Sequence, residues 1–150
     1  MDELELEFRL HERLANDGIV LGDFPLNRLL LINDANYPWF VLVPRRADVT
    51  EIYHLTAEEQ SQLIHESSYL AESLADTFAA HKMNVATLGN MVPQLHLHHI
   101  VRYETDPAWP DPIWGKAPAR PYTADQIDEL LRKLGGIMAG ELAFVPHDPN

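Results

Sequence analysis

The sequence contains no cysteine, which excludes a disulfide framework and any zinc site built from thiolates. It also lacks an apolar run near the roughly 18 residues of a membrane-spanning helix. Its longest apolar runs, at 29–32 and 40–43, have the length of strands. The N-terminus is acidic and lacks the basic start of a signal peptide. We therefore expect a cytoplasmic protein that does not enter a membrane.

Positive charge is also scarce. The chain has 11 Lys and Arg against 23 Asp and Glu, which gives a formal net charge of −12. Proteins that bind nucleic acid need a basic surface, so we expect no nucleic-acid partner. Main-chain N–H groups and imidazoles could still hold a small phosphate compound. The length of 150 residues fits a single domain, 1–150.

Short apolar runs separated by turn residues predict strands at 19–23, 29–33, 39–44, 85–88 and 94–102. The stretch at 4–10 fits either a strand or, together with Leu14, a helix. Strands on either side of a long helix indicate an α+β fold with a mainly antiparallel sheet.

Two helices carry clear start signals. Thr56 and Glu59 form a capping box before an apolar stripe that reaches residue 78, which predicts the longest helix. A second capping box opens a helix at 123–134, and we expect the two glycines at 135–136 to end it. Residues 106–122 are rich in Pro and Trp and should be irregular, and the tail to residue 150 should be loose.

The segment 94–100 reads Gln-Leu-His-Leu-His-His-Ile. In a strand, alternate side chains share a face, so His96 and His98 should point the same way with Gln94 beside them. His99 should face the opposite way. A neutral imidazole is a competent nucleophile near pH 7, and a second one can donate to a phosphate oxygen or a leaving group.

A loop that can hold an anion precedes this segment. Gly89 can start a tight turn whose backbone N–H groups point together, and Asn90 adds an amide donor. Phosphate oxygens held there would lie close to His96, which favours phosphoryl or nucleotidyl transfer through a covalent intermediate.

On these residues the chain resembles the histidine triad (HIT) family of nucleotide hydrolases and transferases. That family's motif is His-φ-His-φ-His-φ-φ, with φ an apolar residue. Three further segments are similar to the family's: 30–33, a strand that ends in a ribose-binding Asn or Asp; 40–45, an apolar strand that ends in Pro and a basic residue; and 89–93, the phosphate loop. The resemblance covers about residues 8–105, and 106–150 are an extension without a family signal.

The resemblance implies a role for each matching residue. His96 falls on the nucleophile that attacks the α-phosphate, and His98 on the histidine that contacts the phosphate and assists the leaving group. Asn33 falls on the ribose-binding position. Gly89, Asn90 and Met91 fall on the phosphate loop. The implied substrate is a dinucleoside polyphosphate or a nucleoside phosphoramidate, in a homodimer that needs no metal or cofactor, although a divalent cation can accompany a polyphosphate.

The chain departs from the family pattern at two positions. Gln94 replaces the first histidine, where the family mainly uses the backbone carbonyl to orient the nucleophile. Trp39 stands where many members carry a further histidine. These departures leave open a non-catalytic nucleotide sensor. A metal-dependent cupin-like enzyme, with Glu104 as a ligand beside His96 and His98, is a further alternative.

Two more sets of residues have open roles. Trp109 and Trp114 either cover the site or a dimer partner, or anchor the irregular segment. Arg45 and Arg46 fit the solvated end of a strand, with a role in binding phosphate as the alternative.

Overall fold

The computed structural model describes residues 7–148 and has an α+β fold. Six strands form one sheet in the order β4-β5-β3-β2-β1-β6, and every neighbouring pair is antiparallel. In chain order the elements are α2 (Glu12–Asp17), β1 (Gly18–Asp23), β2 (Asn27–Ile32), β3 (Trp39–Pro44), a 3-10 turn (Ile52–His54), α3 (Ala57–Phe78), β4 (Lys82–Ala86), β5 (Leu97–Arg102), α4 (Ala124–Lys133), α5 (Gly135–Met138) and β6 (Val145–Pro146).

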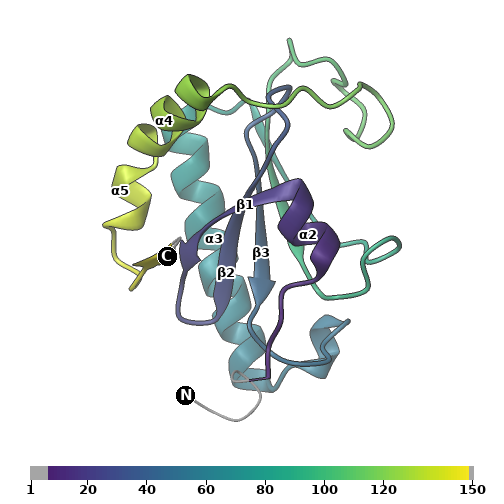
Figure 1. The fold of residues 1–150 in the computed structure, drawn as a ribbon, viewed down its shortest axis with the longest axis vertical. Coiled ribbons are helices and arrows are strands. Elements are labelled where there is room, and N and C mark those ends of the chain that lie inside the picture. The colour runs from purple at the N-terminus through teal and green to yellow at the C-terminus, as the bar shows by residue number, and fades with distance from the viewer. Residues whose placement is uncertain (1–6, 149–150) are drawn as a thin grey trace.

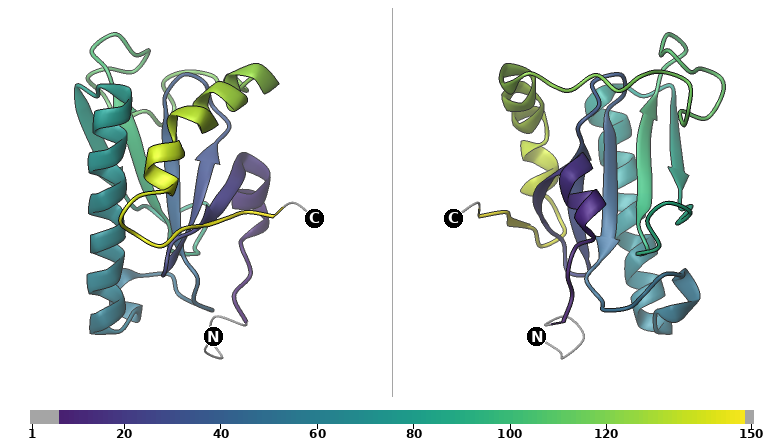
Figure 2. Two further views of the ribbon diagram at one scale, coloured as in Figure 1. Left: turned by 90° about the vertical axis from the view of Figure 1, so that its left-hand side faces the viewer. Right: turned by 45° about the vertical axis from the view of Figure 1, so that its right-hand side comes forward.

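The helices lie on both faces of the sheet. The long helix α3 runs along one face together with α4 and α5, whereas the short α2 lies on the other (Figures 1 and 2). The α3 face buries alternate residues of the strands, among them Leu29, Leu31, Phe40 and Leu42. The α2 face buries the residues between them, which pack with Leu14 of the helix. Both faces of the central strands are therefore covered, which explains their apolar runs without alternation.

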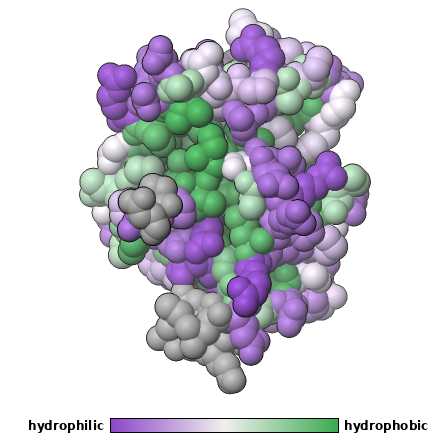
Figure 3. All heavy atoms as spheres, viewed as in Figure 1, coloured by the Kyte–Doolittle hydropathy of each residue, from purple (hydrophilic) through white to green (hydrophobic). Residues whose placement is uncertain are grey.

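Hydrophobic residues also reach the surface. Figure 3 shows a strip of them down the centre of one face, between more hydrophilic regions on both sides. The exposed large hydrophobic side chains of residues 7–148 are Tyr53, Ile64, Val85, Leu88, Met91, Trp114 and Val145. Three of these surround the cavity described below.

Local sequence signals fix the start of α3. Thr56 caps the helix and Glu59 bonds back to the Thr56 backbone, so that both halves of the capping box are present. The helix covers 57–78 as predicted, and the β3 bounds 39–44 also match the prediction.

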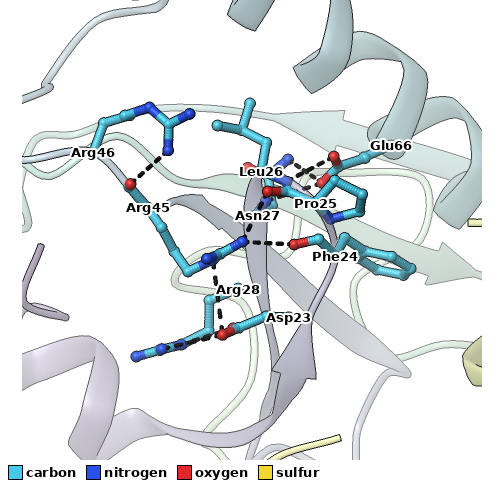
Figure 4. A network of polar contacts seen from close by, with 9 residues as sticks. All are labelled: Asp23, Phe24, Pro25, Leu26, Asn27, Arg28, Arg45, Arg46 and Glu66. Atoms are coloured by element: carbon cyan, nitrogen blue, oxygen red, sulfur yellow. Dashed lines mark hydrogen bonds and ion pairs between the residues drawn. The ribbon is translucent and has the colours of Figure 1, made fainter. Parts of the chain in front are cut away.

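A buried carboxylate ties α3 to the turn between β1 and β2 (Figure 4). Glu66 is fully buried and accepts hydrogen bonds from the backbone N–H groups of Leu26 and Asn27, from the Asn27 amide and from Gln62. Four donors to one carboxylate offset much of the cost of removing its charge from water.

The arginine pair after β3 is not a solvated strand end, so that prediction was wrong. The guanidinium of Arg45 donates to the carbonyls of Phe24 and Pro25, both at 2.8 Å (Figure 4). Arg46 forms an ion pair with Glu59 of α3. Both side chains hold the β1–β2 turn and the start of α3 against the end of β3.

Some predicted boundaries were also wrong. Strand β4 spans Lys82–Ala86 instead of 85–88, because Lys82 pairs with Arg102 and Ala86 with His98. Helix α4 ends at Lys133, close to the predicted end, but the glycine pair then opens the short α5. Of the ambiguous N-terminal stretch and Leu14, only Leu14 lies in a helix, α2. Residues 1–6 lie outside the described residues.

The tail is held against β1 as far as His147, whose backbone N–H donates to the Leu21 carbonyl. Phe144 contacts Phe24 edge-on at 4.9 Å, and β6 pairs with β1 beside Gly22. A Cβ at Gly22 would lie 2.4 Å from the carbonyl oxygen of Val145, so only glycine admits this close approach. The expectation of a loose tail was therefore wrong for these residues, while 149–150 lie outside the described part of the chain.

Candidate active site

Strand β5 presents imidazoles on both of its faces. His98 pairs with Val41 and shares the α2 face, whereas His99 pairs with Phe40 and shares the α3 face. The side chain of His99 is fully buried, and its Nε2 lies 2.7 Å from the hydroxyl of Ser67 on α3. The expectation that His96 and His98 share one face, with His99 on the other, agrees with this arrangement.

His96 lies just before β5 and is oriented by its own backbone. Its Nδ1 lies 2.6 Å from the carbonyl oxygen of Gln94. Because a carbonyl only accepts hydrogen bonds, Nδ1 carries the proton, and Nε2 of the neutral ring keeps its lone pair. The His96 and His98 rings lie 4.9 Å apart. The site thus has one imidazole nitrogen available for attack beside a second imidazole.

Two tryptophans surround His98. The indole N–H of Trp39 donates to Nδ1 of His98 at 3.0 Å. Trp114 lies edge-on to His98 at 5.1 Å and edge-on to Trp39 at 6.2 Å. Trp114 comes from the Pro/Trp-rich segment and brings it into the site. Trp109 instead packs on the guanidinium of Arg102 at 5.5 Å, so one tryptophan lines the site and the other anchors the segment.

Burial favours the neutral form of both site histidines. Burial lowers the pKa of His96, although the Gln94 carbonyl acts in the opposite direction. Burial, with the nearby His96 and His99, lowers the pKa of His98 to about 3. Both rings are therefore neutral near pH 7, the form in which an imidazole nitrogen can attack.

A cavity of about 400 Å³ opens onto the two imidazoles. It is lined by Arg13, Leu14 and Asp17 of α2, Ile32, Trp39, Leu88 to Val92, His96, His98 and Trp114. Gly89 has a φ of +76°, in the left-handed region that favours glycine. The cavity therefore brings Gly89, Asn90 and Met91 of the predicted phosphate loop together with the two histidines.

Two of the predicted site residues do not line this cavity. The side chain of Gln94 turns towards the N-terminal segment, where it donates to the Arg9 carbonyl and accepts from the His11 N–H. The prediction that Gln94 lies beside the imidazoles was therefore wrong. Alternation of side chains does not apply there, because residues 94–96 precede the strand. Asn33 accepts from the backbone N–H of Tyr122 at 2.9 Å. Its role towards ribose stays a prediction.

The sequence did not point to Arg13 or Asp17, and it left open whether Trp114 covers the site or anchors the irregular segment. Arg13 and Asp17 form an ion pair at 3.5 Å across one turn of α2, at the edge of the cavity. No local pattern marks them, because their place depends on how α2 crosses the sheet. Trp114 lies 16 positions after His98 in the chain and outside the motif, so only the tertiary fold brings it back to that ring.

The residues of the cupin-like alternative do not come together. Glu104 lies 3.7 Å from His81 and is not among the residues that line the cavity. Within residues 7–148, no group of three or more His, Asp or Glu side chains is placed to hold a metal ion. The α+β sheet with its helices also differs from an all-β barrel, so that alternative was wrong. No helix in the described range is both long and apolar enough to cross a membrane.

Comparison with known proteins agrees with this geometry. The model of the HIT domain family matches residues 13–105. A histidine triad protein from Marinobacter aquaeolei VT8 is 55% identical, with 85% of this chain and 93% of that one covered and a TM-score of 0.84. A second, from Bradyrhizobium japonicum, is 44% identical over 85% and 95% of the two chains, with a TM-score of 0.83.

A histidine triad protein from Sinorhizobium meliloti 1021 is 40% identical over 87% of this chain and 96% of the other, with a TM-score of 0.84. None of the curated proteins compared with the chain matches it. A family model that covers most of the chain, together with three structures of this identity, identifies the fold as HIT-like. The chain belongs to the HIT domain family.

Proposed function

We propose that the protein is a nucleotide hydrolase or nucleotidyl transferase that acts at the α-phosphate through a nucleotidyl-histidine intermediate. The observation that carries the proposal is the orientation of His96, whose Nδ1 is bound to the Gln94 carbonyl at 2.6 Å so that Nε2 is left for attack. Family membership supports the reaction class. The substrates that we propose are dinucleoside polyphosphates or nucleoside phosphoramidates.

The other residues have proposed roles around that step. The loop at 89–91 would bind phosphate oxygens through backbone N–H groups and the Asn90 amide. His98 would donate to the phosphoryl group, and Asn33 would bind ribose from outside the cavity lining. In such reactions catalysis comes mainly from positioning the reactants and from stabilising the negative charge on the phosphoryl oxygens.

The proposal also covers the cofactor requirement and the oligomeric state of the protein. The chemistry of His96 needs no cofactor, and a divalent cation would arrive with a polyphosphate substrate. We also propose a homodimer, as the family resemblance implies. Size-exclusion chromatography with light scattering measures the mass directly, and a monomer at micromolar concentration would contradict the dimer.

The test is rapid-quench incubation with radiolabelled adenosine polyphosphates and phosphoramidates, followed by intact mass measurement. We expect an acid-labile adduct of one AMP, which His96→Ala abolishes while AMP binding persists. His99→Leu is the matched control, because it removes an imidazole of the same motif that faces away from the cavity. AMP binding without adduct or AMP release would contradict the enzyme and favour the nucleotide sensor.

A further inference from the structure

We propose that Trp39 is a positioning residue whose indole N–H holds His98 as a neutral Nε2–H donor that gives no proton to the leaving group. The starting observation is the 3.0 Å hydrogen bond from Trp39 Nε1 to His98 Nδ1. An indole N–H can donate but cannot accept. Nδ1 of His98 must therefore be the unprotonated nitrogen, which places the ring's single proton on Nε2.

The same hydrogen bond opposes a second proton on His98. An imidazolium carries hydrogen on both nitrogens, and its Nδ1–H would then face the indole N–H. The surroundings act in the same direction. Burial and the two neighbouring imidazoles, His96 and His99, disfavour a positive charge on this ring. Across the cavity the charged groups are Arg13 and Asp17, which are paired with each other.

Packing keeps the indole of Trp39 and the imidazole of His98 in this arrangement. Trp114 contacts both of them edge-on, and Trp39 also packs against the buried residues of two core clusters. A histidine at position 39 could donate or accept, according to its tautomer, whereas tryptophan allows one role only. Tryptophan in place of histidine at position 39 therefore makes His98 a fixed hydrogen-bond donor.

A fixed donor limits the chemistry, on the basis of the function proposed above. The Nε2 lone pair of His96 forms the N–P bond while the bond from phosphorus to the leaving group breaks, and the leaving atom takes the bonding pair. Water then attacks phosphorus, the N–P pair returns to Nε2, and the proton from water passes to solvent. His98 donates a hydrogen bond throughout but keeps its proton, because neutral imidazole is a very weak acid.

The substrate class follows from this proton balance. A leaving group that is stable as an anion, such as a phosphate or a carboxylate, can depart without a proton. An alkylamine cannot, because its nitrogen must be protonated before it leaves. Among the two substrate classes proposed above, the site therefore favours nucleotides with an acidic leaving group over phosphoramidates of basic amines.

The first test reads the tautomer without any substrate. In protein with 15N-labelled histidine, long-range 1H–15N spectra should show His98 with Nδ1 unprotonated and Nε2 protonated between about pH 5 and pH 8. Replacing Trp39 by benzothienylalanine keeps the shape of the indole and removes only the N–H. In that variant we expect a population with Nδ1 protonated, and Trp39→Phe should give the same result.

His99 is an internal control in the same spectra. Its Nδ1 lies 3.1 Å from the Leu97 carbonyl, so it has the opposite tautomer and should not change. A protonated Nδ1 on His98 in the unmodified protein would overturn the proposal. So would a His98 signal that is the same with and without the indole N–H.

The second test reads the leaving group. For adenosine 5′-aryl phosphates with phenols of rising pKa, kcat/KM should fall steeply, and an alkylamine phosphoramidate should react at least about 10²-fold more slowly than the best phenol. Equal rates along the series would overturn the leaving-group assignment. If no substrate releases AMP, the proposed function fails as well, while the tautomer is still decided by NMR.

Discussion

The two faces of strand β5 carry the same side-chain chemistry for different purposes. On the α3 face, both ring nitrogens of His99 have partners, the Leu97 carbonyl and the Ser67 hydroxyl. On the cavity face, His96 and His98 each use only Nδ1 towards the described residues, and Nε2 has no partner among them. An imidazole whose two nitrogens are both bound holds the structure together, whereas one with a remaining nitrogen can act on a ligand.

The largest expected effect tests this difference in activity. His96→Ala removes the attacking nitrogen and should lower turnover at least about 10³-fold, since single catalytic nucleophiles are worth that much or more. His99→Leu should retain turnover within a few-fold, because it leaves the cavity lining intact. Steady-state kinetics of the two variants measure the contrast. Equal losses would show that the two faces do not differ in function.

The next effect tests the structural face. Glu66→Gln places an amide where four donors meet one carboxylate, so that donor faces donor, and should cost about 2–3 kcal/mol of unfolding free energy. The exposed Glu72→Gln on the same helix is the control and should change stability by less than about 0.5 kcal/mol. Urea unfolding measures both. A Glu66→Gln protein as stable as the control would mean that this buried network contributes little.

The pH dependence of stability sharpens the comparison further. Burial lowers the pKa of His99 to about 4, so as pH falls below about 6.5 the unfolded chain binds a proton that the folded chain does not. Stability contributed by the neutral ring is therefore present above pH 6.5 and lost as the pH falls towards 4. Between pH 7 and about 4.5 this amounts to about 2–3 kcal/mol.

His99→Leu should remove that part of the pH dependence and leave the part due to His98, whose lowered pKa acts with the same sign. Unfolding curves at the two pH values measure the change. A variant as sensitive to acid as the original protein would contradict a neutral, buried His99.

The smallest effect concerns the aromatic wall of the cavity. Trp114 is 39% exposed and meets His98 only edge-on. For Trp114→Ala we therefore expect a KM about two- to tenfold higher with little change in kcat. Trp114→Phe, which keeps an aromatic ring, should recover most of the loss. An unchanged KM in the alanine variant would mean that the wall does not touch substrate.

Much of the fold was predictable, because its signals are local. A capping box and an apolar stripe define α3, and Pro38 and Pro44 bracket β3. The two-residue strand β6 was missed, because two residues carry no periodicity and depend on the edge of β1. The wrong start of β5 has a similar cause, since the bonds of the Gln94 side chain are to residues more than 80 positions away.

The site was predictable only where the motif itself is local. The cavity brings His96, His98 and the Gly89 loop together, as the spacing indicates. The bond from Trp39 to His98 depends on β3–β5 register, in which Trp39 pairs with Ile100 and Val41 with His98. That register sets a tryptophan beside a histidine 59 positions away, so neither segment alone predicts the contact.

The Pro/Trp-rich segment is held at both ends. Near its start, the buried Arg102 at the end of β5 binds the Asp106 carboxylate and the Asp111 carbonyl. Near its end, Asn36 donates to the Pro118 carbonyl, and Asn33 accepts from the backbone of Tyr122.

Because both ends of the segment are held, the sequence between the two anchors can be exchanged in protein engineering. Residues 114–117, which include Trp114, can be varied as a cassette while both anchors keep their contacts and the buried Ile113 stays unchanged. A library over these four positions would diversify the wall next to His98 without altering the motif strand, and selection on leaving groups would test the function proposed above.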